Sequence, residues 1–325
     1  MAKMENQKLK LLVLKEYLEQ NTDPDHPATI HDLVAHLESR DIHAERKSIY
    51  RDIQLLIDSG CDIVTSRGKN AGYYMNAGTF DIAELKLLAD AVLSSRFLTA
   101  RKSSELLKKL GTLTSRYRAL ELRRSMVVSG RVKSMNESVI YNVDDLHEAI
   151  RTDSQIRFRY FEWDRNKNRV FRRQTRSASP YALCWDDSNY YLIAHTEEHG
   201  LTNFRVDKMM NIRLTGEPRV RTEETKKLDL SRYGKEVFGM FNGERIKVRM
   251  RFENSLSGVV IDRFGKDVML IPDGEDHFTC TEEIMVSPVF YAWFASFGTR
   301  ARLLSPESVV EDFRKTVASV AALYE

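Results

Sequence analysis

The spacing of hydrophobic residues changes along this chain near residue 138. Before that point apolar residues recur at helical intervals, apart from one short alternating segment, and after it alternating runs dominate, separated by Asp, Asn and Gly clusters. Because a helical period and a strand period suit different elements, the 325 residues are expected to form several domains. The sequence predicts an α+β multidomain protein with domains at 1–78, 79–140, 141–225 and 226–325.

Residues 1–78 predict three helices and a hairpin. Apolar stripes mark helices at 7–20, 29–40 and about 45–59, and Gly60 closes the third as a C-terminal glycine does. Thr29 and Asp32 have the spacing of a capping box at the start of the second helix. The next segment alternates like a strand, turns and returns, and reads CDIVTSRGKNAGYYM. Three helices followed by a two-stranded wing is the pattern of a winged helix-turn-helix.

The third helix presents polar and cationic side chains when its apolar residues face the core. In a helix-turn-helix the second helix of the motif enters the DNA major groove, where Arg, Lys and Gln pair with base edges and hydroxyl groups reach phosphates. We therefore expect DNA contacts from Arg46, Lys47, Ser48, Tyr50, Arg51 and Gln54, with Arg67 and Lys69 at the wing tip. Asp52 is expected to be a structural acceptor.

Charge is distributed unevenly although the whole chain has a net charge of only +3. Residues 1–78 contain 10 Lys/Arg and 12 Asp/Glu, a balance of −2, which favours discrete contacts by a dimer over a basic sheath. Residues 151–177 contain 9 Lys/Arg and 3 Asp/Glu, a balance of +6. Like charges at that density repel one another unless an anion neutralises them, so this segment indicates an anionic ligand.

The other segments predict distinct architectures. Residues 79–140 read as two helices joined by RFLTARK, a helical connector with a dimerising surface. Residues 141–225 predict a short helix and several strands that would close into a small antiparallel barrel. Residues 245–325 predict the order strand, helix, strand, strand, helix, strand, helix, an α+β sandwich.

Three segments resemble known families. The third helix, RKSIYRDIQLLIDSG, together with GYYM, resembles the DNA-binding domain of DeoR-like winged-helix regulators, with Ser48 where threonine is usual. The segment PYALCWDDSNYYLIAHTEEHGLTNFRVDKM resembles the WYL domain, with Tyr190, Tyr191 and Leu192 in place of Trp-Tyr-Leu. The segment YAWFASFGTRARLLSPESVVEDFRKTV is similar to the extension that follows WYL domains.

The WYL resemblance implies an Sm-like, SH3-like barrel that senses a ligand, in some members a nucleic acid or nucleotide. The resemblance transfers pocket roles to Tyr181, Tyr191, His195, Arg205 and Lys208. The basic and aromatic pattern itself adds Tyr160, Arg172, Arg173 and Arg176, since arginines hold phosphates and rings can stack on bases. Tyr190, Leu192, Phe204 and Val206 are expected to be barrel core.

Other chemistry finds little support in the sequence. No apolar run approaches the length of a membrane helix, and three widely spaced cysteines fit a reducing cytoplasm. The segment HTEEH at 195–199 formally matches an inverted zinc-protease pattern, but it leads into Gly200 and predicts a turn. We therefore expect no catalytic site, no metal and no cofactor.

Together these features predict a cytoplasmic, bacterial, ligand-responsive transcription regulator that binds a quasi-palindromic operator in double-stranded DNA as a homodimer. Its WYL pocket would sense an anionic ligand, an oligonucleotide or nucleotide. Two alternatives remain open at this point. One is an accessory protein that binds single-stranded nucleic acid through the barrel, and the other is a metal-dependent hydrolase that uses His195 and His199.

Overall fold

The computed structural model describes the chain except for residues 1, 69, 77–79, 125–132 and 172–174. The chain divides into two compact units, Met1–Glu137 and Ser138–Glu325. Both units combine helices with antiparallel strands, so the mixed α and β composition predicted from the sequence is confirmed.

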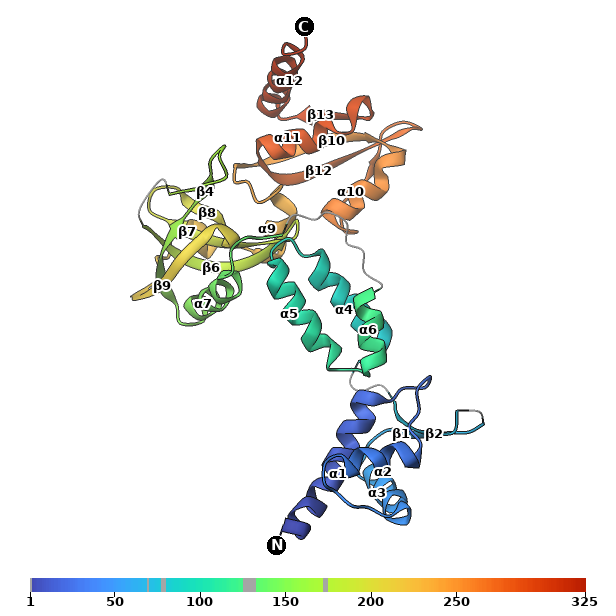
Figure 1. Ribbon diagram of the computed structural model, residues 1–325. Helices are drawn as coiled ribbons and strands as arrows, with labels where there is room; N and C mark the ends of the chain where they lie inside the picture. Colours follow the sequence, from blue (N-terminus) through green and yellow to red (C-terminus); the bar gives the residue numbers. More distant parts are fainter. Residues whose placement is uncertain (1, 69, 77–79, 125–132, 172–174) are drawn as a thin grey trace. The chain divides into compact units, whose positions relative to one another are not determined.

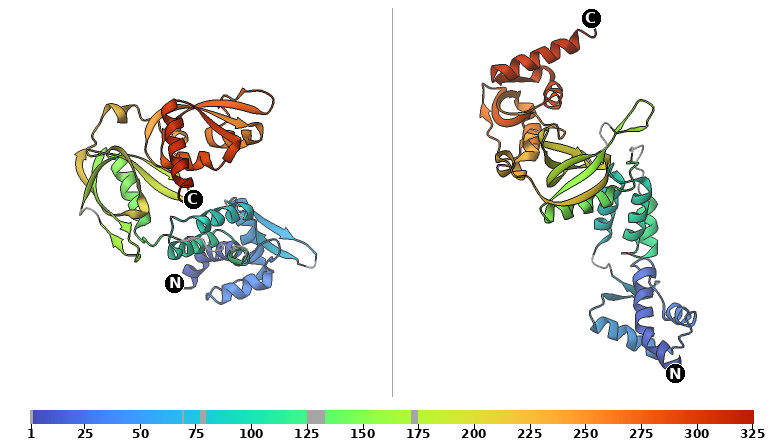
Figure 2. Two further views of the ribbon diagram at one scale, coloured as in Figure 1. Left: turned by 90° about the horizontal axis from the view of Figure 1, so that it is seen from above. Right: turned by 90° about the vertical axis from the view of Figure 1, so that its left-hand side faces the viewer.

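The first unit begins with three helices packed around one core (Figures 1 and 2). These helices are α1 (Ala2–Asn21), α2 (Ile30–Glu38) and α3 (Arg46–Asp58). Leu14, Leu33 and Ile49 contribute one fully buried side chain each from the three helices. The predicted capping box is present, because Thr29 Oγ1 accepts from the amide of Asp32 and the Asp32 carboxylate accepts from the amide of Thr29.

A hairpin follows α3 and projects from the three helices in Figures 1 and 2. Its strands are β1 (Ile63–Ser66) and β2 (Gly72–Met75), paired antiparallel. Ala28, just before α2, forms a further bridge to Tyr73 through two backbone hydrogen bonds of 2.8 Å. A Cβ atom at Gly72 would lie 2.6 Å from the Ala28 carbonyl oxygen, so only glycine permits this approach.

Three helices follow in the part of residues 80–137 that the structure describes, where the sequence predicted two. They are α4 (Ile82–Ser94), α5 (Ala100–Gly111) and α6 (Arg116–Arg124). The predicted second helix is broken after Gly111, and Ser115 starts a new one by accepting from the amide of Arg118 at 3.2 Å. The same hydroxyl donates to Asp23 Oδ2 at 2.5 Å, so a contact distant in sequence fixes the break.

The second unit starts with α7 (Val139–Arg151), which lies against a five-stranded antiparallel sheet. The strand order is β8-β7-β6-β3-β9. The strands are β3 (Ser154–Tyr160), β6 (Arg176–Asp186), β7 (Asn189–Thr196), β8 (Gly200–Arg205) and β9 (Met209–Pro218), with a 3₁₀ turn, η1 (Val206–Lys208), before β9. A separate small hairpin pairs β4 (Glu162–Trp163) with β5 (Arg169–Val170). The sheet is antiparallel, as predicted, while its closure into a barrel stays a prediction.

Two short helices, α8 (Glu223–Lys226) and α9 (Leu230–Glu236), lead to the last part of the chain. Tyr233 of α9 is fully buried in a cluster that includes Ile193 of the five-stranded sheet and Met285 of the next one. Burial raises the pKa of Tyr233 to about 12, and its hydroxyl donates to Asn203 at 3.0 Å. This cluster therefore joins the two sheets of the second unit.

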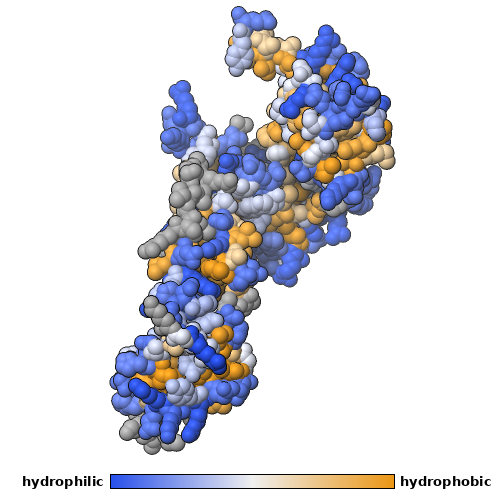
Figure 3. Space-filling model, turned by 90° about the vertical axis from the view of Figure 1, so that its right-hand side faces the viewer, coloured by the Kyte–Doolittle hydropathy of each residue, from blue (hydrophilic) through white to orange (hydrophobic). Residues whose placement is uncertain are grey.

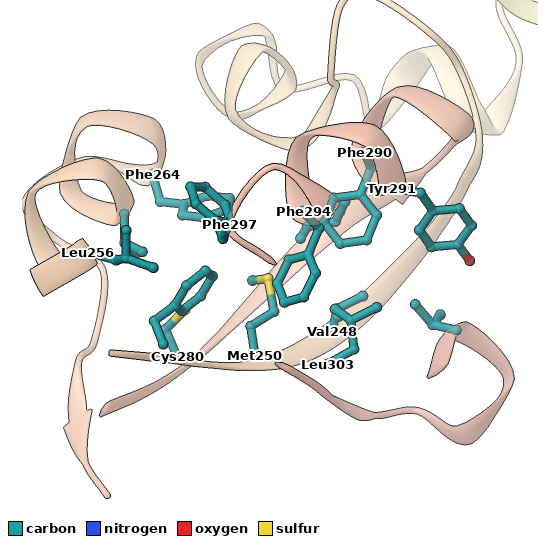
Figure 4. Close-up of a cluster of buried hydrophobic side chains, with 14 of the residues drawn as sticks. Val248, Met250, Leu256, Phe264, Cys280, Phe290, Tyr291, Phe294, Phe297 and Leu303 are labelled. Atoms are coloured by element: carbon teal, nitrogen blue, oxygen red, sulfur yellow. The ribbon is translucent and has the colours of Figure 1, made fainter. Parts of the chain in front are cut away.

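The C-terminal part has the element order that the sequence predicted. Its elements are β10 (Glu244–Glu253), α10 (Ser257–Phe264), β11 (Ile271–Pro272), β12 (His277–Val286), α11 (Pro288–Ala295), β13 (Ala301–Ser305) and α12 (Glu307–Ala321), with 3₁₀ turns η2 (Asn254–Leu256) and η3 (Gly298–Arg300). The sheet order is β11-β12-β10-β13. Phe290 and Phe294 of α11 pack over Met250 of β10 (Figure 4).

Hydrophobic side chains also reach the surface, as the patches on one face in Figure 3 show. Val317 and Val320 are exposed in α12, and Leu323 and Tyr324 are exposed in the residues that follow it. None of the helices drawn from the described ranges has both the length and the apolar character needed to cross a membrane.

Candidate functional site

Helix α3 separates its side chains into two faces. Ile49, Ile53 and Leu56 are buried in the core of the first unit. The residues on the opposite face are exposed: Arg46, Lys47, Tyr50, Arg51, Gln54, Leu55 and Asp58. Five of the six α3 residues predicted to contact DNA therefore share one solvent-facing surface, which we call the α3 face.

Ser48 is the sixth, and it does not belong to the α3 face. It is half-buried, and its hydroxyl accepts a 2.6 Å hydrogen bond from Lys10 of α1. The same ammonium group lies 2.6 Å from Asp52 Oδ2, and both charged side chains are about nine-tenths buried, with 9% and 11% exposed. Asp52 thus has a structural role, as the sequence indicated, but through a buried ion pair with Lys10, and Ser48 shares that partner.

The α3 face offers several kinds of contact. The guanidinium and ammonium groups of Arg46, Lys47 and Arg51 are held by no carboxylate in the described part of the chain. Gln54 donates to Asp58 one turn later at 2.8 Å, so its amide is already oriented along the helix. The ring of Tyr50, half exposed, meets the edge of Tyr73 in the hairpin at 6.5 Å between centroids.

Leu55 was not among the predicted contacts, although 54% of it is exposed in the middle of the α3 face. An apolar side chain in such a position can contact a thymine methyl group. Its place four residues after Arg51 is the signal that could have identified it, because residues four apart lie on the same side of a helix. In the hairpin, Arg67 is exposed. Lys69 lies outside the described residues.

The predicted ligand residue Arg205 is engaged within the protein. Its guanidinium donates to both carboxylate oxygens of Asp207, at 3.0 and 2.8 Å, and to Asn189 at 3.0 Å. Burial works to lower the pKa of Arg205, but the hydrogen bonds and charge of Asp207 raise it above its ordinary value. An internal bidentate pair of this kind leaves little charge to offer to a ligand.

The predicted aromatic residues are also engaged. The Tyr160 hydroxyl accepts from the amide of Arg205 at 3.3 Å, and burial raises the pKa of Tyr160 to about 12. Tyr181 donates from its hydroxyl to the Val220 carbonyl, with Arg219 over its ring. Burial raises the pKa of the half-buried Tyr191.

The remaining predicted ligand residues do not lie together in one site. Arg176 and His195 line one groove of about 410 Å³ on the five-stranded sheet. The Arg176 guanidinium lies 5.7 Å from the centre of the Tyr160 ring, whose hydroxyl accepts from the Arg205 amide. Lys208 lies in η1, half-buried. Arg172 and Arg173 fall outside the described residues.

A second groove of about 530 Å³ lies on the same sheet, and the sequence analysis did not select it. It is lined by Arg157, Phe158, Arg159, Thr175, Asn211, Arg213, Leu214, Thr215 and Glu217. Three arginines face one carboxylate here, so the lining has an excess of positive charge. The signal available in the sequence was the alternation of arginines in QIRFRYF and NIRLTG.

The HTEEH segment occupies a hairpin turn. His195 is the second-to-last residue of β7, and residues 197–199 form the turn before Gly200. Within the described ranges, no three His, Cys, Asp or Glu side chains gather closely enough to hold a metal ion.

Comparison with solved structures finds remote likenesses. The proteasome accessory factor B/C (PafBC) of Arthrobacter aurescens is 20% identical, with a TM-score of 0.30 over 99% of this chain and 49% of that one. A CRISPR Cas-related protein is 14% identical, with a TM-score of 0.37 over 99% of this chain and 85% of that one. The chain thus spans about half the length of PafBC, and neither score supports a functional argument.

No curated protein matches the sequence. Two family models do match, and both fall in the second unit. The WYL domain covers α7 and most of the five-stranded sheet, and the WCX domain covers the part from β10 to α12. The chain therefore contains a WYL domain at residues 141–214 followed by a WCX domain at residues 244–321.

Proposed function

We propose that this chain is a ligand-responsive, DNA-binding transcription regulator. The α3 face would enter the major groove of an operator, with the hairpin that carries Arg67 alongside the phosphate backbone. The WYL domain would bind an anionic ligand, and the WCX domain would follow it as a further structural part. The proposal assigns no catalytic step and no metal to the chain.

The observation that carries the proposal is the composition of the α3 face. Three cations, a tyrosine, an amide and an exposed leucine share one side of a helix whose other side is buried. This mixture supports both positioning on phosphates and reading of base edges. A helix exposed only for solubility needs neither an exposed leucine nor cations without carboxylate partners.

The finer proposal concerns assembly and coupling. Two protomers would place their α3 faces one helical turn apart on a quasi-palindromic operator. Ligand binding to the WYL domain would change DNA affinity through residues 79–140, which requires different ligand affinity in the two states. The single-strand-binding alternative is favoured by one specific observation, the cationic groove on the five-stranded sheet.

The test compares duplex and single-strand binding. The probe is a duplex selected by the wild-type protein from a random pool, and the variant is Lys47→Ala with Arg51→Ala. We expect duplex affinity to fall at least about 30-fold, since each of the two contacts contributes about 1–3 kcal/mol. Binding of a single-stranded oligonucleotide should stay unchanged.

The matched control is Lys108→Ala with Lys109→Ala, which removes two exposed charges from α5 of the same unit. It should lower duplex affinity only slightly. Equal losses in both variants would show a general charge effect and contradict a reading role for α3. Unchanged duplex binding in the α3 variant would favour the single-strand alternative.

A further inference from the structure

We propose that the groove between β3 and β9 is a site for phosphate groups, held through their oxygens by Arg157, Arg159 and Arg213 and not by base stacking. The inference deepens the proposed function by locating an anion site in the WYL domain. It makes no use of the α3 face, so an experiment can contradict the phosphate site without contradicting the proposed DNA contact, and the reverse.

The first argument is the placement of like charges. Arg157 of β3 and Arg213 of β9 are direct partners in the antiparallel register. Side chains at such positions lie about 5 Å apart at Cβ, and like charges there destabilise a sheet. Both residues are exposed, and no carboxylate of the described chain neutralises either. An anion bound between them would convert this repulsion into attraction.

The third arginine is fixed in place. Arg159 lies on the same face of β3 as Arg157, and its guanidinium is stacked 3.8 Å from the centre of the Phe171 ring. Its Nε is buried, with no hydrogen-bond partner among the described residues. A guanidinium stacked on a ring is oriented in advance, which reduces the entropy lost when its terminal N–H groups bind an oxyanion.

The backbone also bends at this groove. Between Arg157 and Arg159 the register with β9 shifts, because β9 carries an extra residue opposite β3. Asn211, which lines the groove, has a φ of 54° in the left-handed region. Such bulges re-aim side chains beside binding sites, and here the bulge lies between the two strands that bring Arg213 and Arg159 together.

Aromatic rings do not provide a stacking surface at this groove. Phe171 is covered by Arg159, and Phe158 points into the core, where it packs edge-on against Phe204 at 5.1 Å. Recognition through phosphate oxygens alone therefore predicts indifference to the bases. The phosphates can come from a nucleic-acid strand or from a small phosphorylated molecule.

The experiment measures binding to the full-length protein by fluorescence polarisation. The probes are a labelled oligothymidylate and an abasic deoxyribose-phosphate oligomer of equal length, with pyrophosphate as competitor. Wild-type protein should bind the two oligomers with dissociation constants within about threefold of each other. Displacement by pyrophosphate identifies a small phosphorylated ligand as the source, and displacement only by oligomer identifies a strand.

The decisive variant is Arg157→Gln with Arg213→Gln. Affinity for both oligomers should fall about 100-fold at low salt, and the slope of log affinity against log salt should fall by about 1.4, since two phosphate contacts are lost. Its melting temperature should not fall, because the substitution removes facing like charges.

Arg165→Gln with Lys167→Gln is the matched control, since it removes two exposed charges from the β4–β5 turn outside the groove. Equal weakening in the control, full affinity in the groove variant, or tight binding of oligothymidylate without the abasic oligomer would overturn the proposal. Lys47→Ala with Arg51→Ala should leave this binding unchanged, which separates it from the proposed operator contact.

Discussion

Lys10 and Asp52 show how a single buried pair fixes the orientation of α3. The pair lies between α1 and α3 with both charges largely removed from water. A buried carboxylate that loses its partner is strongly destabilising, while replacing both members by apolar groups is often neutral or stabilising. The pair thus constrains the position of the helix more than it adds to stability.

Lys10→Met should therefore lower the free energy of unfolding of the first unit by about 3 kcal/mol. Adding Asp52→Leu should restore most of that loss, because no uncompensated charge remains. Chemical denaturation followed by circular dichroism measures both. Equal destabilisation by the single and double variants would show that the pair is worth more than its desolvation cost.

At the same scale, the sequence identified some residues and missed others. The helical spacing of apolar residues along α3 was sufficient to place Arg46, Lys47 and Arg51 outward. It could not show that Ser48 meets Lys10, because that contact joins residues 38 positions apart. Nor could it show that Arg205 is neutralised by Asp207, since a motif gives residue types and not their partners.

The break between α5 and α6 depends on contacts between elements. Asp23, in the loop after α1, accepts from Ser115 and contacts His26 Nδ1 at 2.8 Å, and the His26 ring stacks on Tyr117 at 3.8 Å. Burial acts to raise the pKa of Asp23, but the hydrogen bonds from Ser115 and His26 outweigh it and hold that pKa below its ordinary value. Apolar residues keep their helical spacing across residues 112–115, so the local sequence pattern did not predict the break there.

This arrangement predicts the pH dependence of the first unit. A depressed native pKa means that ionised Asp23 contributes stability above its unfolded-state pKa of about 3.9, and that the contribution is lost as pH falls through the native value. Ser115→Ala removes one stabilising hydrogen bond, so acid unfolding should begin at a higher pH. Circular dichroism against pH tests this.

Thr112→Ala is the control for that titration, because its hydroxyl donates to the Lys109 carbonyl in the same turn and has no other partner among the described residues. It should leave the acid midpoint unchanged. A shift of the same size in both variants would remove Asp23 as the cause. An acid midpoint of Ser115→Ala identical to that of the wild type would likewise show that Asp23 does not determine the acid unfolding.

At the scale of the whole molecule, the chain consists of two units with separate cores. Units with their own cores commonly unfold as separate cooperative steps. Scanning calorimetry should show two transitions, and Lys10→Met should move only one of them. A single transition that moves as a whole would show that the units are thermodynamically coupled.

The order of elements was predictable at this scale because it depends on local periods. The seven elements from β10 to α12 follow the predicted order. The meeting of Arg157 with Arg213 was not predictable from local periods, because these two residues become neighbours only through strand pairing.

The two faces of α3 have a consequence for how this protein can diverge. Its core contacts and its solvent-facing side chains are made by different residues of one helix. Substitutions at the outward positions alter the surface chemistry of α3 without disturbing the interior. Selection can therefore change what the helix binds while its core packing stays constant. Descendants of such a gene would be expected to vary at Lys47, Gln54 and Leu55 long before Ile49 or Ile53.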